Sequence, residues 1–490
     1  MLKKILWATT ACMVLSLAPC PAFCADNSTA ITTSSSVVSG VGGINADMLK
    51  KFSAAKPYDG KINAISAQNL NELSEKRSVL QAKDKFFTTK IDTGAVSDQK
   101  RSGRCWLFAA LSMLSPKVVE KYSVSDFEFS QNYNTFYDKL EKANMFYEMM
   151  IKYADRDIMD RNLRIWLKDP ISDGGHWTFA SDIIEKYGVV PNYAMAETVH
   201  SNNTTTMSYV LEGLLRKHAA EIRELAKQGK SVDELRQVKE KDLSEVYSLL
   251  TMCLGEPPQK FNLRFEVKND KKDKKDKKDK KDKKITESKF VTPVEFYKSL
   301  GVNLGDYISI FSNPAWNYNE YYVIENNRNM YDSKDLPMIN IELDKFKEAA
   351  KNSIKDGEPV WFAADASHDM DRKLGVMYED LYDYSSLLGI NTKMPKKERY
   401  LYGSSVANHA MLVTGYDEVN GKITKWCVKN SWGKTPGDAG YFTMYDNWVD
   451  DNVYQFIVNK KYLSKDVLDL LKKTPVVLPE YDLMRENLNK

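Results

Sequence analysis

The chain has little cysteine, little histidine and no long apolar run beyond its first 24 residues. Only six of its 490 residues are cysteines and five are histidines. Half of the cysteines lie in the first 24 residues, and the rest of the chain keeps Cys105, Cys253 and Cys427. Three cysteines exclude a disulfide scaffold and leave at least one free thiol, although a pairing of Cys253 with Cys427 stays open. The absence of further apolar runs excludes a multi-span membrane protein.

The chain also lacks an excess of charge of one sign. Its formal net charge is +3, but residues 270–284 alone hold ten lysines and five aspartates. Without this tract, which contributes +5, the rest of the chain carries −2. No basic surface is indicated, so no nucleic-acid partner is expected. The apolar fraction of 43% and the length favour a soluble protein with two or three domains or lobes.

The N-terminus has the pattern of a secretory signal peptide. Two lysines precede the apolar run ILWATTACMVLSLA, and small residues and proline follow it up to residue 25. We expect a signal peptide at residues 1–24, export to the periplasm or outside the cell, and a flexible linker at 25–43. The run is too short to favour a retained anchor helix. Lipoprotein anchoring through Cys20 or Cys24 is a less favoured alternative.

Residues 44–490 are expected to form an α+β domain with a helical lobe and a strand-rich lobe. Helical periodicity covers 46–83, the segment after Cys105, 133–153 and 207–253, and Pro116 is expected to end or kink the second of these. Short β-rich runs separated by turns occupy 400–460. Residues 270–284 are expected to be a solvated loop at the tip of an insertion, because their flanks FNLRFEV and KFVTPVEFY have the pattern of ordered elements.

The first chemical motif is a cysteine at the start of an apolar helix. Cys105 follows the turn KRSGR, and the N-terminus of a helix favours the thiolate over the thiol. Gln99 lies six residues earlier, where its side-chain amide and the Cys105 backbone N–H could stabilise an oxyanion. Taken alone, the motif is equally compatible with a buried cysteine that begins a helix.

A histidine and an asparagine in the strand-rich half complete a nucleophilic set. His409 begins a strand with two apolar faces, and its imidazole could take the thiol proton to give a resting ion pair. Asn430 is expected to accept a hydrogen bond from Nδ1–H and so aim Nε2 at sulfur, with Trp432 covering that bond. His218, which lies on a predicted helix, is interpreted as a surface residue.

The chain order Gln, Cys, His, Asn is that of papain-like cysteine peptidases. The histidine follows the cysteine by 304 residues, so an inserted helical region is expected at about 195–260. Several long segments resemble bleomycin hydrolase and bacterial aminopeptidase C over about residues 44–490. They include QKRSGRCWLFAAL, FEFSQNYNTFYDKLEKANMFYE, DGGHWTFASDIIEKYGVVP, NHAMLVTGY and VKNSWG.

This resemblance implies a papain-like two-lobed fold, a homohexameric barrel and aminopeptidase activity on peptides, with no metal or organic cofactor. The roles of nucleophile, general base and acid, orienting group and oxyanion donor are carried over to Cys105, His409, Asn430 and Gln99. Gly174 and Gly175 match the glycine pair along which a substrate backbone pairs as a strand.

The resemblance extends to a C-terminal arm at about 475–490. In this family the arm lies in the cleft, so the terminal carboxylate of Lys490 would face the α-ammonium of the substrate. The frame LPEYDLM matches the family's arm, whereas the final residues RENLNK depart from its small, apolar ending. The sequence therefore predicts an exported cysteine aminopeptidase. One alternative is an endopeptidase whose arm leaves the cleft open; another is a non-catalytic protein that binds surfaces through residues 270–284.

Overall fold

The computed structural model describes residues 43–124, 127–266, 286 and 288–487. The expected signal peptide at 1–24, nearly all of the linker at 25–43, the tract at 270–284 and Lys490 lie outside the described residues. The chain divides into two compact units, residues 1–67 and 68–490. In the described part of the first unit, two helices occur, α1 (Ala46–Ala54) and α2 (Asp59–Ser66), and neither buries a side chain.

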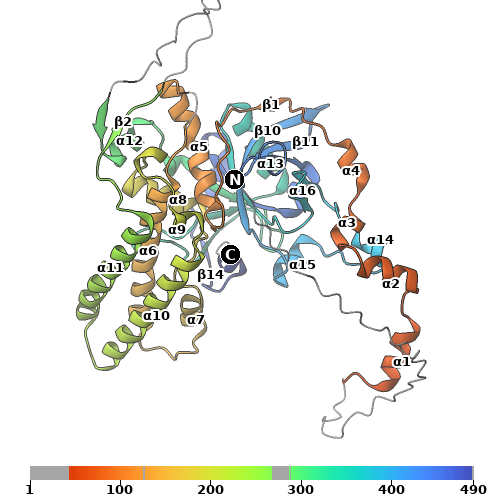
Figure 1. Cartoon of the computed structure of the whole chain (residues 1–490), viewed down its shortest axis with the longest axis horizontal. Helices are drawn as coiled ribbons and strands as arrows, with labels where there is room; N and C mark the ends of the chain where they lie inside the picture. Colours follow the sequence, from red (N-terminus) through yellow and green to blue (C-terminus); the bar gives the residue numbers. More distant parts are fainter. Residues whose placement is uncertain (1–42, 125–126, 267–285, 287, 488–490) are drawn as a thin grey trace, which may run out of the picture. The chain divides into compact units, whose positions relative to one another are not determined.

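The helical half of the second unit is built around α6 (Gln131–Lys152), whose side chains are almost all buried. Ser130 caps this helix by accepting a hydrogen bond from the backbone N–H of Tyr133. Around α6 lie α5 (Cys105–Tyr122), α7 (Arg161–Lys168), α8 (Trp177–Tyr187), α10 (Thr205–Lys227) and α11 (Val232–Leu254), as Figure 1 shows. The helices expected from the sequence at 133–153 and after Cys105 are thus confirmed.

The helix after Cys105 does not end at Pro116, one of the two outcomes expected there, and the surface position expected for His218 is wrong. Helix α5 continues past Pro116 without a break, because Leu114 and Val118 on either side are buried in the core and their packing outweighs the lost backbone hydrogen bond. His218 is 1% exposed rather than on the surface. Its Nδ1 lies 2.7 Å from the hydroxyl of Tyr147, in the interface of α10 with α6.

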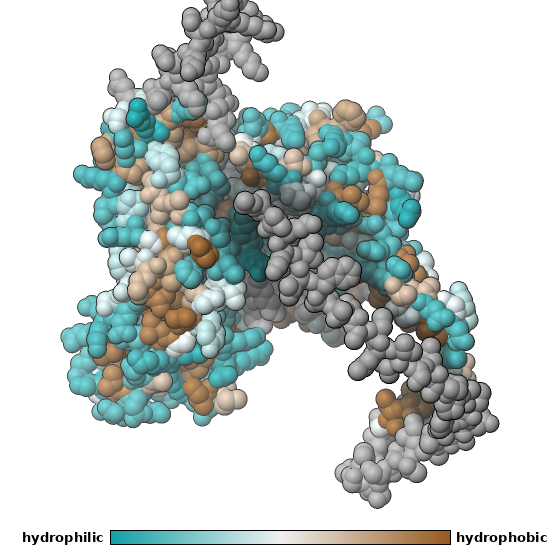
Figure 2. Space-filling view, in the orientation of Figure 1, coloured by the Kyte–Doolittle hydropathy of each residue, from teal (hydrophilic) through white to brown (hydrophobic). Residues whose placement is uncertain are grey.

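The inserted region forms a helical hairpin. Helices α10 and α11 are joined by a turn in which Gly229 has φ +86°, a conformation that glycine adopts without strain. Ser231 and Glu234 form a capping box at the start of α11. In Figure 2 the hairpin presents mainly hydrophilic residues, as expected of helices whose apolar faces pack on α6.

The strand-rich half contains one large sheet. Its order is β14-β5-β6-β4-β13-β7-β10-β11-β12-β9-β8, with β1 paired to β10. The central strands β7 (Val360–Ala364) and β10 (His409–Val419) are antiparallel, with His409 opposite Ala364. All of β7 and the first eight residues of β10 are buried. The expected α+β class is confirmed, because this sheet packs directly against α5.

The remaining elements are short. The strands are β1 (Thr89–Lys90), β2 (Phe261–Leu263), β3 (Lys289–Val291), β4 (Tyr307–Phe311), β5 (Glu320–Ile324), β6 (Met338–Asn340), β8 (Met370–Asp371), β9 (Val376–Met377), β11 (Lys422–Lys429), β12 (Tyr441–Tyr445), β13 (Val453–Asn459) and β14 (Val476–Leu478). The helices are α3 (Leu70–Ser74), α4 (Arg77–Ala82), α9 (Val199–Asn202), α12 (Pro293–Ser299), α13 (Leu343–Lys355), α14 (Tyr384–Leu388), α15 (Lys396–Leu401), α16 (Asp446–Asn452), α17 (Lys465–Leu470) and α18 (Leu483–Asn487).

The flanks of the lysine-rich tract are ordered, as the sequence predicts. Strands β2 and β3 pair antiparallel, with Phe261 opposite Val291, so the two ends of the insertion are held together. Cys105, Cys253 and Cys427 are all free thiols, so the pairing left open above does not form here. No helix in the described ranges is long and apolar enough to cross a membrane.

Candidate active site

Helix α5 and strand β10 bring the predicted cysteine and histidine to one cavity. The indole N–H of Trp361 on β7 donates to the backbone carbonyl of Trp106, which joins the first turn of α5 to the sheet (3.0 Å). Cys105 begins that turn and His409 begins β10. Both side chains line a cavity of about 460 Å³, together with Gln99 and Trp432.

A buried arginine fixes the turn in front of the cysteine. Arg104 is 1% exposed, and its guanidinium donates to both carboxylate oxygens of Glu197 at 3.2 and 2.8 Å. It also donates to the carbonyl of Ser201 at 2.7 Å and to the hydroxyl of Ser102 at 2.9 Å. Sequence reasoning missed this residue, because an arginine in a polar turn has the pattern of a surface residue.

The Cys105 side chain is half-buried at the N-terminus of α5. The backbone N–H of Ala410, the residue after His409, donates to Sγ at 3.5 Å. Burial raises the pKa of the Cys105 thiol to about 11, although backbone N–H groups of Ala410, Trp106 and Cys105 itself act in the opposite direction. The thiol is therefore in contact with the start of β10, across the boundary between helices and sheet.

The histidine is oriented by the predicted asparagine but through the other ring nitrogen. His409 Nε2 lies 2.9 Å from Asn430 Oδ1, which leaves Nδ1 as the nitrogen available to the thiol. The sequence expectation, Nδ1 to asparagine and Nε2 to sulfur, is wrong, because strand alternation fixes the face of a residue but not the rotation of its ring. The Ser431 backbone N–H also donates to Oδ1, at 2.7 Å, and so fixes the amide.

Trp432 covers the imidazole on one side. Its ring stacks on that of His409 with a centroid separation of 4.6 Å and an interplanar angle of 21°. Burial lowers the pKa of His409 to about 4, the hydrogen bond to Asn430 raises it, and the charge of Arg372 lowers it further. Together with the raised pKa of the thiol, this favours a neutral thiol and a neutral imidazole at rest over the ion pair expected from the sequence.

Gln99 lines the cavity and is held in place at both ends of its amide. Its Nε2 donates to the carbonyl of Ser102 at 2.6 Å, and its Oε1 accepts from the hydroxyl of Ser431 at 2.6 Å. An amide nitrogen has two hydrogens, so a second donor remains for a ligand. The assignment of Gln99 as oxyanion donor stays a prediction.

The glycine pair lies beside the cavity. The carbonyl of Gly174 accepts from Lys142 Nζ at 2.7 Å, and a Cβ on Gly175 would lie 2.7 Å from the ring of Trp106. Gly175 is therefore required by packing, and the role of the pair in binding a substrate backbone stays a prediction. Neighbouring Asp173, which sequence reasoning missed, does line the cavity, and its carboxylate accepts from the Gly103 backbone N–H at 3.1 Å.

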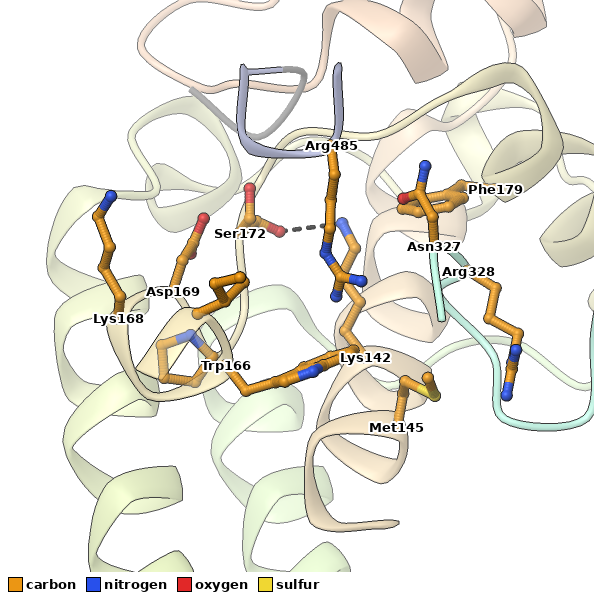
Figure 3. A pocket seen from close by; sticks show the side chains of 12 residues that line it. Lys142, Met145, Trp166, Lys168, Asp169, Ser172, Phe179, Asn327, Arg328 and Arg485 are labelled. Atoms are coloured by element: carbon orange, nitrogen blue, oxygen red, sulfur yellow. Dashed lines mark hydrogen bonds between the residues drawn. The ribbon is translucent and has the colours of Figure 1, made fainter. Parts of the chain in front are cut away.

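The start of the C-terminal arm is anchored by two charged residues. The buried carboxylate of Glu480 accepts from the indole N–H of Trp166 at 3.1 Å and from the hydroxyl of Tyr153. The guanidinium of Arg485 lies 4.4 Å from the ring centroid of Trp166 and donates to the carbonyl of Asn326 at 3.1 Å. Figure 3 shows Arg485 reaching into a cavity of about 280 Å³ above Trp166. The placement of Lys490 at the substrate stays a prediction.

No group of side chains suited to hold a metal ion occurs in the described part of the chain. The polar groups that line the first cavity include the thiol of Cys105, the imidazole of His409 and the amide of Gln99. This combination is suited to nucleophilic attack on a carbonyl carbon with proton transfer by the imidazole.

Comparisons with known proteins identify the family of the chain. The sequence model of the Peptidase C1-like family matches residues 44–485. Aminopeptidase E of Lactobacillus helveticus is 39% identical over 89% of this chain and 97% of its own length. Aminopeptidase C of Listeria innocua is 40% identical over 86% of this chain and 92% of its own length.

A solved relative confirms the papain-like fold expected from the sequence. The crystal structure of PepW from Lactobacillus rhamnosis HN001 superposes with a TM-score of 0.84 at 37% identity, covering 90% of this chain and 99% of that one. The extent and number of these matches support one conclusion. The chain belongs to the Peptidase C1-like family of papain-like cysteine peptidases.

Proposed function

We propose that this protein is a cysteine aminopeptidase that removes N-terminal residues from peptides through an acyl-enzyme on Cys105. The strongest support for this proposal is the position of the cysteine and the histidine. The thiol of Cys105 and the imidazole of His409 line one cavity, and the backbone N–H that follows His409 reaches Sγ. The relatives named as aminopeptidases support cleavage at the N-terminus of the peptide.

The chemistry follows from the protonation states of the pair. His409 takes the thiol proton at Nδ1 as sulfur attacks the carbonyl carbon of the first peptide bond. Asn430, which holds Nε2–H, keeps the ring in the tautomer that this transfer needs and stabilises the imidazolium that forms. The Cys105 backbone N–H and the Gln99 amide face the developing oxyanion in this proposal. His409 then protonates the leaving amine, and water hydrolyses the thioester with the same residue as base.

The C-terminal arm supports cleavage at the N-terminus of a substrate peptide rather than at an internal peptide bond. Glu480 is held by Trp166 on α7, and Arg485 is held by the carbonyl of Asn326 after β5, so the first part of the arm has a defined position. We extend the proposal to export, which rests on the signal peptide expected at residues 1–24. N-terminal sequencing of the mature protein, with Ala25 expected as its first residue, tests this part.

One peptide offered in free and N-acetylated forms tests the proposed activity. We expect the free peptide to lose its first residue, and the acetylated form to be cleaved about 100-fold more slowly or not at all. Alkylation of the thiols should abolish the first reaction. Cleavage of both forms at the same internal bond would show an endopeptidase instead, and hydrolysis that survives alkylation would exclude a thiol enzyme.

The low pKa of His409 predicts activity in acid. The imidazole is a base only when neutral, and it is neutral above a pKa of about 4. We therefore expect kcat/KM for an aminoacyl anilide to stay level from pH 7 down to about 5 and to halve near pH 4, while the substrate amine stays protonated throughout.

Trp432→Ala provides the matched comparison for this profile. The substitution admits water to the imidazole, so the acid limb should move to higher pH. A wild-type limb near 6.5, the ordinary histidine value, would contradict burial as the controlling factor. The same would follow if the limb did not move in the variant.

A further inference from the structure

A second cavity adjoins the catalytic one. It has a volume of about 940 Å³, and Ala366, Ser367 and Arg372 line both cavities. We call this second cavity the leaving-side recess. Most of its other walls come from the segment 368–404, which lies between β7 and β10, and Asn71 and Asp451 complete them. A peptide bound at Cys105 would therefore have direct access to it.

The contacts place the recess on the histidine side of the thiol. The backbone N–H of Ala366 donates to Asn408 Oδ1 at 2.9 Å, and Asn408 Nδ2 donates to Ser367 Oγ at 3.1 Å. Hydrogen bonds thus join the wall of the recess to Asn408, the residue before His409. In the proposed reaction His409 protonates the departing amine, so the leaving part of the substrate lies on this side.

Arg372 occupies the junction of the two cavities. Its guanidinium lies over the ring of Trp432, 4.9 Å from the centroid, and Trp432 in turn stacks on His409. Its charge also lowers the pKa of His409, which places it within electrostatic reach of the imidazole. Among the described residues Arg372 has no carboxylate partner within 4 Å.

Apart from Arg372, most of the charged side chains that line the recess are negative. Five carboxylates line it, against the two cations Lys393 and Arg399; they are Asp369, Glu379, Asp380, Asp383 and Asp451. Both cations are already paired, Lys393 with Asp380 and Arg399 with Asp451. Asp369 and Glu379 have no cationic partner within 4 Å in the described part of the chain. A second anion would therefore be repelled there.

We propose that Arg372 binds the carboxylate of a short leaving group, so that the enzyme favours dipeptides with a free C-terminus. This inference rests on the proposed function and specifies its substrate class. In a dipeptide the terminal carboxylate belongs to the first leaving residue and lies beside Arg372. In a tetrapeptide the carboxylate lies two residues further on, among Asp369 and Glu379. The free carboxylate thus favours hydrolysis of the dipeptide and disfavours hydrolysis of the tetrapeptide.

The test compares each peptide with its own C-terminal amide. For wild type we expect kcat/KM to be about tenfold higher for dialanine than for dialanine amide, the usual strength of one charge-assisted contact. For tetra-alanine the ratio of acid to amide should be one or lower. In Arg372→Gln the dipeptide ratio should fall to about one, and Arg372→Lys should restore part of it. Because each ratio compares substrates on one enzyme, it is insensitive to changes in His409.

Two controls separate this inference from the proposed function. Alanine anilide has no carboxylate, so the change that Arg372→Gln causes in its kcat/KM reports only on the catalytic residues and is the reference for the loss measured with dialanine. Arg264→Gln, the same substitution at an exposed arginine outside both cavities, should leave every ratio unchanged. A wild-type dipeptide ratio of one, or a ratio that Arg372→Gln does not change, would overturn the inference while anilide hydrolysis upheld the function. Absence of thiol-dependent hydrolysis of all substrates would overturn both.

Discussion

Replacement of Cys105 by alanine is expected to lower kcat/KM for an aminoacyl anilide by about 10⁴-fold or more. The proposed reaction passes through a bond between Sγ and the acyl carbon, and among the described residues that line the catalytic cavity Cys105 is the one thiol. The substitution removes one sulfur atom from the first turn of the helix, so the fold should persist. Steady-state kinetics on purified protein, with circular dichroism to confirm the fold, measure the effect.

Cys253→Ala is the matched control for this loss. Cys253 is also a free, partly buried thiol, but it lies near the end of α11, outside the catalytic cavity. The variant should keep wild-type kcat/KM and its sensitivity to iodoacetamide. If Cys105→Ala retained more than about a hundredth of the wild-type activity, the acyl-enzyme would have to form elsewhere.

Replacement of Arg104 by alanine is expected to lower the free energy of unfolding by about 3 kcal/mol. The substitution leaves Glu197 without its cation and removes the donors to the Ser201 carbonyl and the Ser102 hydroxyl. A carboxylate and a carbonyl without donors in a mostly buried environment destabilise the folded state. We expect this destabilisation to exceed the free energy lost with the packing contacts of the arginine side chain. Urea denaturation followed by tryptophan fluorescence measures the change.

A double variant distinguishes the orphaned charge from lost packing. Glu197→Gln removes the charge that Arg104→Ala leaves unpaired, so the two together should be less destabilising than the sum of the separate variants. Arg264→Ala, at an exposed site, should change stability by less than about 0.5 kcal/mol. A loss below about 1 kcal/mol in Arg104→Ala would show that the network in front of Cys105 is not a stabilising one.

The sequence predicts the chemistry of the site better than its geometry. Local motifs contain all four predicted residues. In the structure Cys105, His409 and Gln99 line one cavity, and Asn430 is hydrogen-bonded to the imidazole of His409. The ring nitrogen that faces Asn430 was predicted wrongly, because it depends on a side-chain rotation that strand periodicity does not determine.

Residues that act through distant partners were missed altogether. Arg104 pairs with Glu197, 93 positions along the chain, and Arg372 stacks on Trp432, sixty positions away. No local pattern marks such pairs, since each arginine lies in a polar turn of ordinary composition. Local propensity also misleads at Pro116. It predicts that the helix ends or kinks there, whereas α5 continues past it and buries its neighbours on both sides.

The most direct test of the account is to isolate the covalent intermediate. Rapid mixing of the enzyme with an aminoacyl ester, an acid quench and mass spectrometry should show a species heavier by one aminoacyl group. Fragmentation should place that group on Cys105, and His409→Ala should slow its formation by about 10³-fold. Turnover of the ester with no covalent species at any time, or an adduct on any other residue, would contradict the central claim.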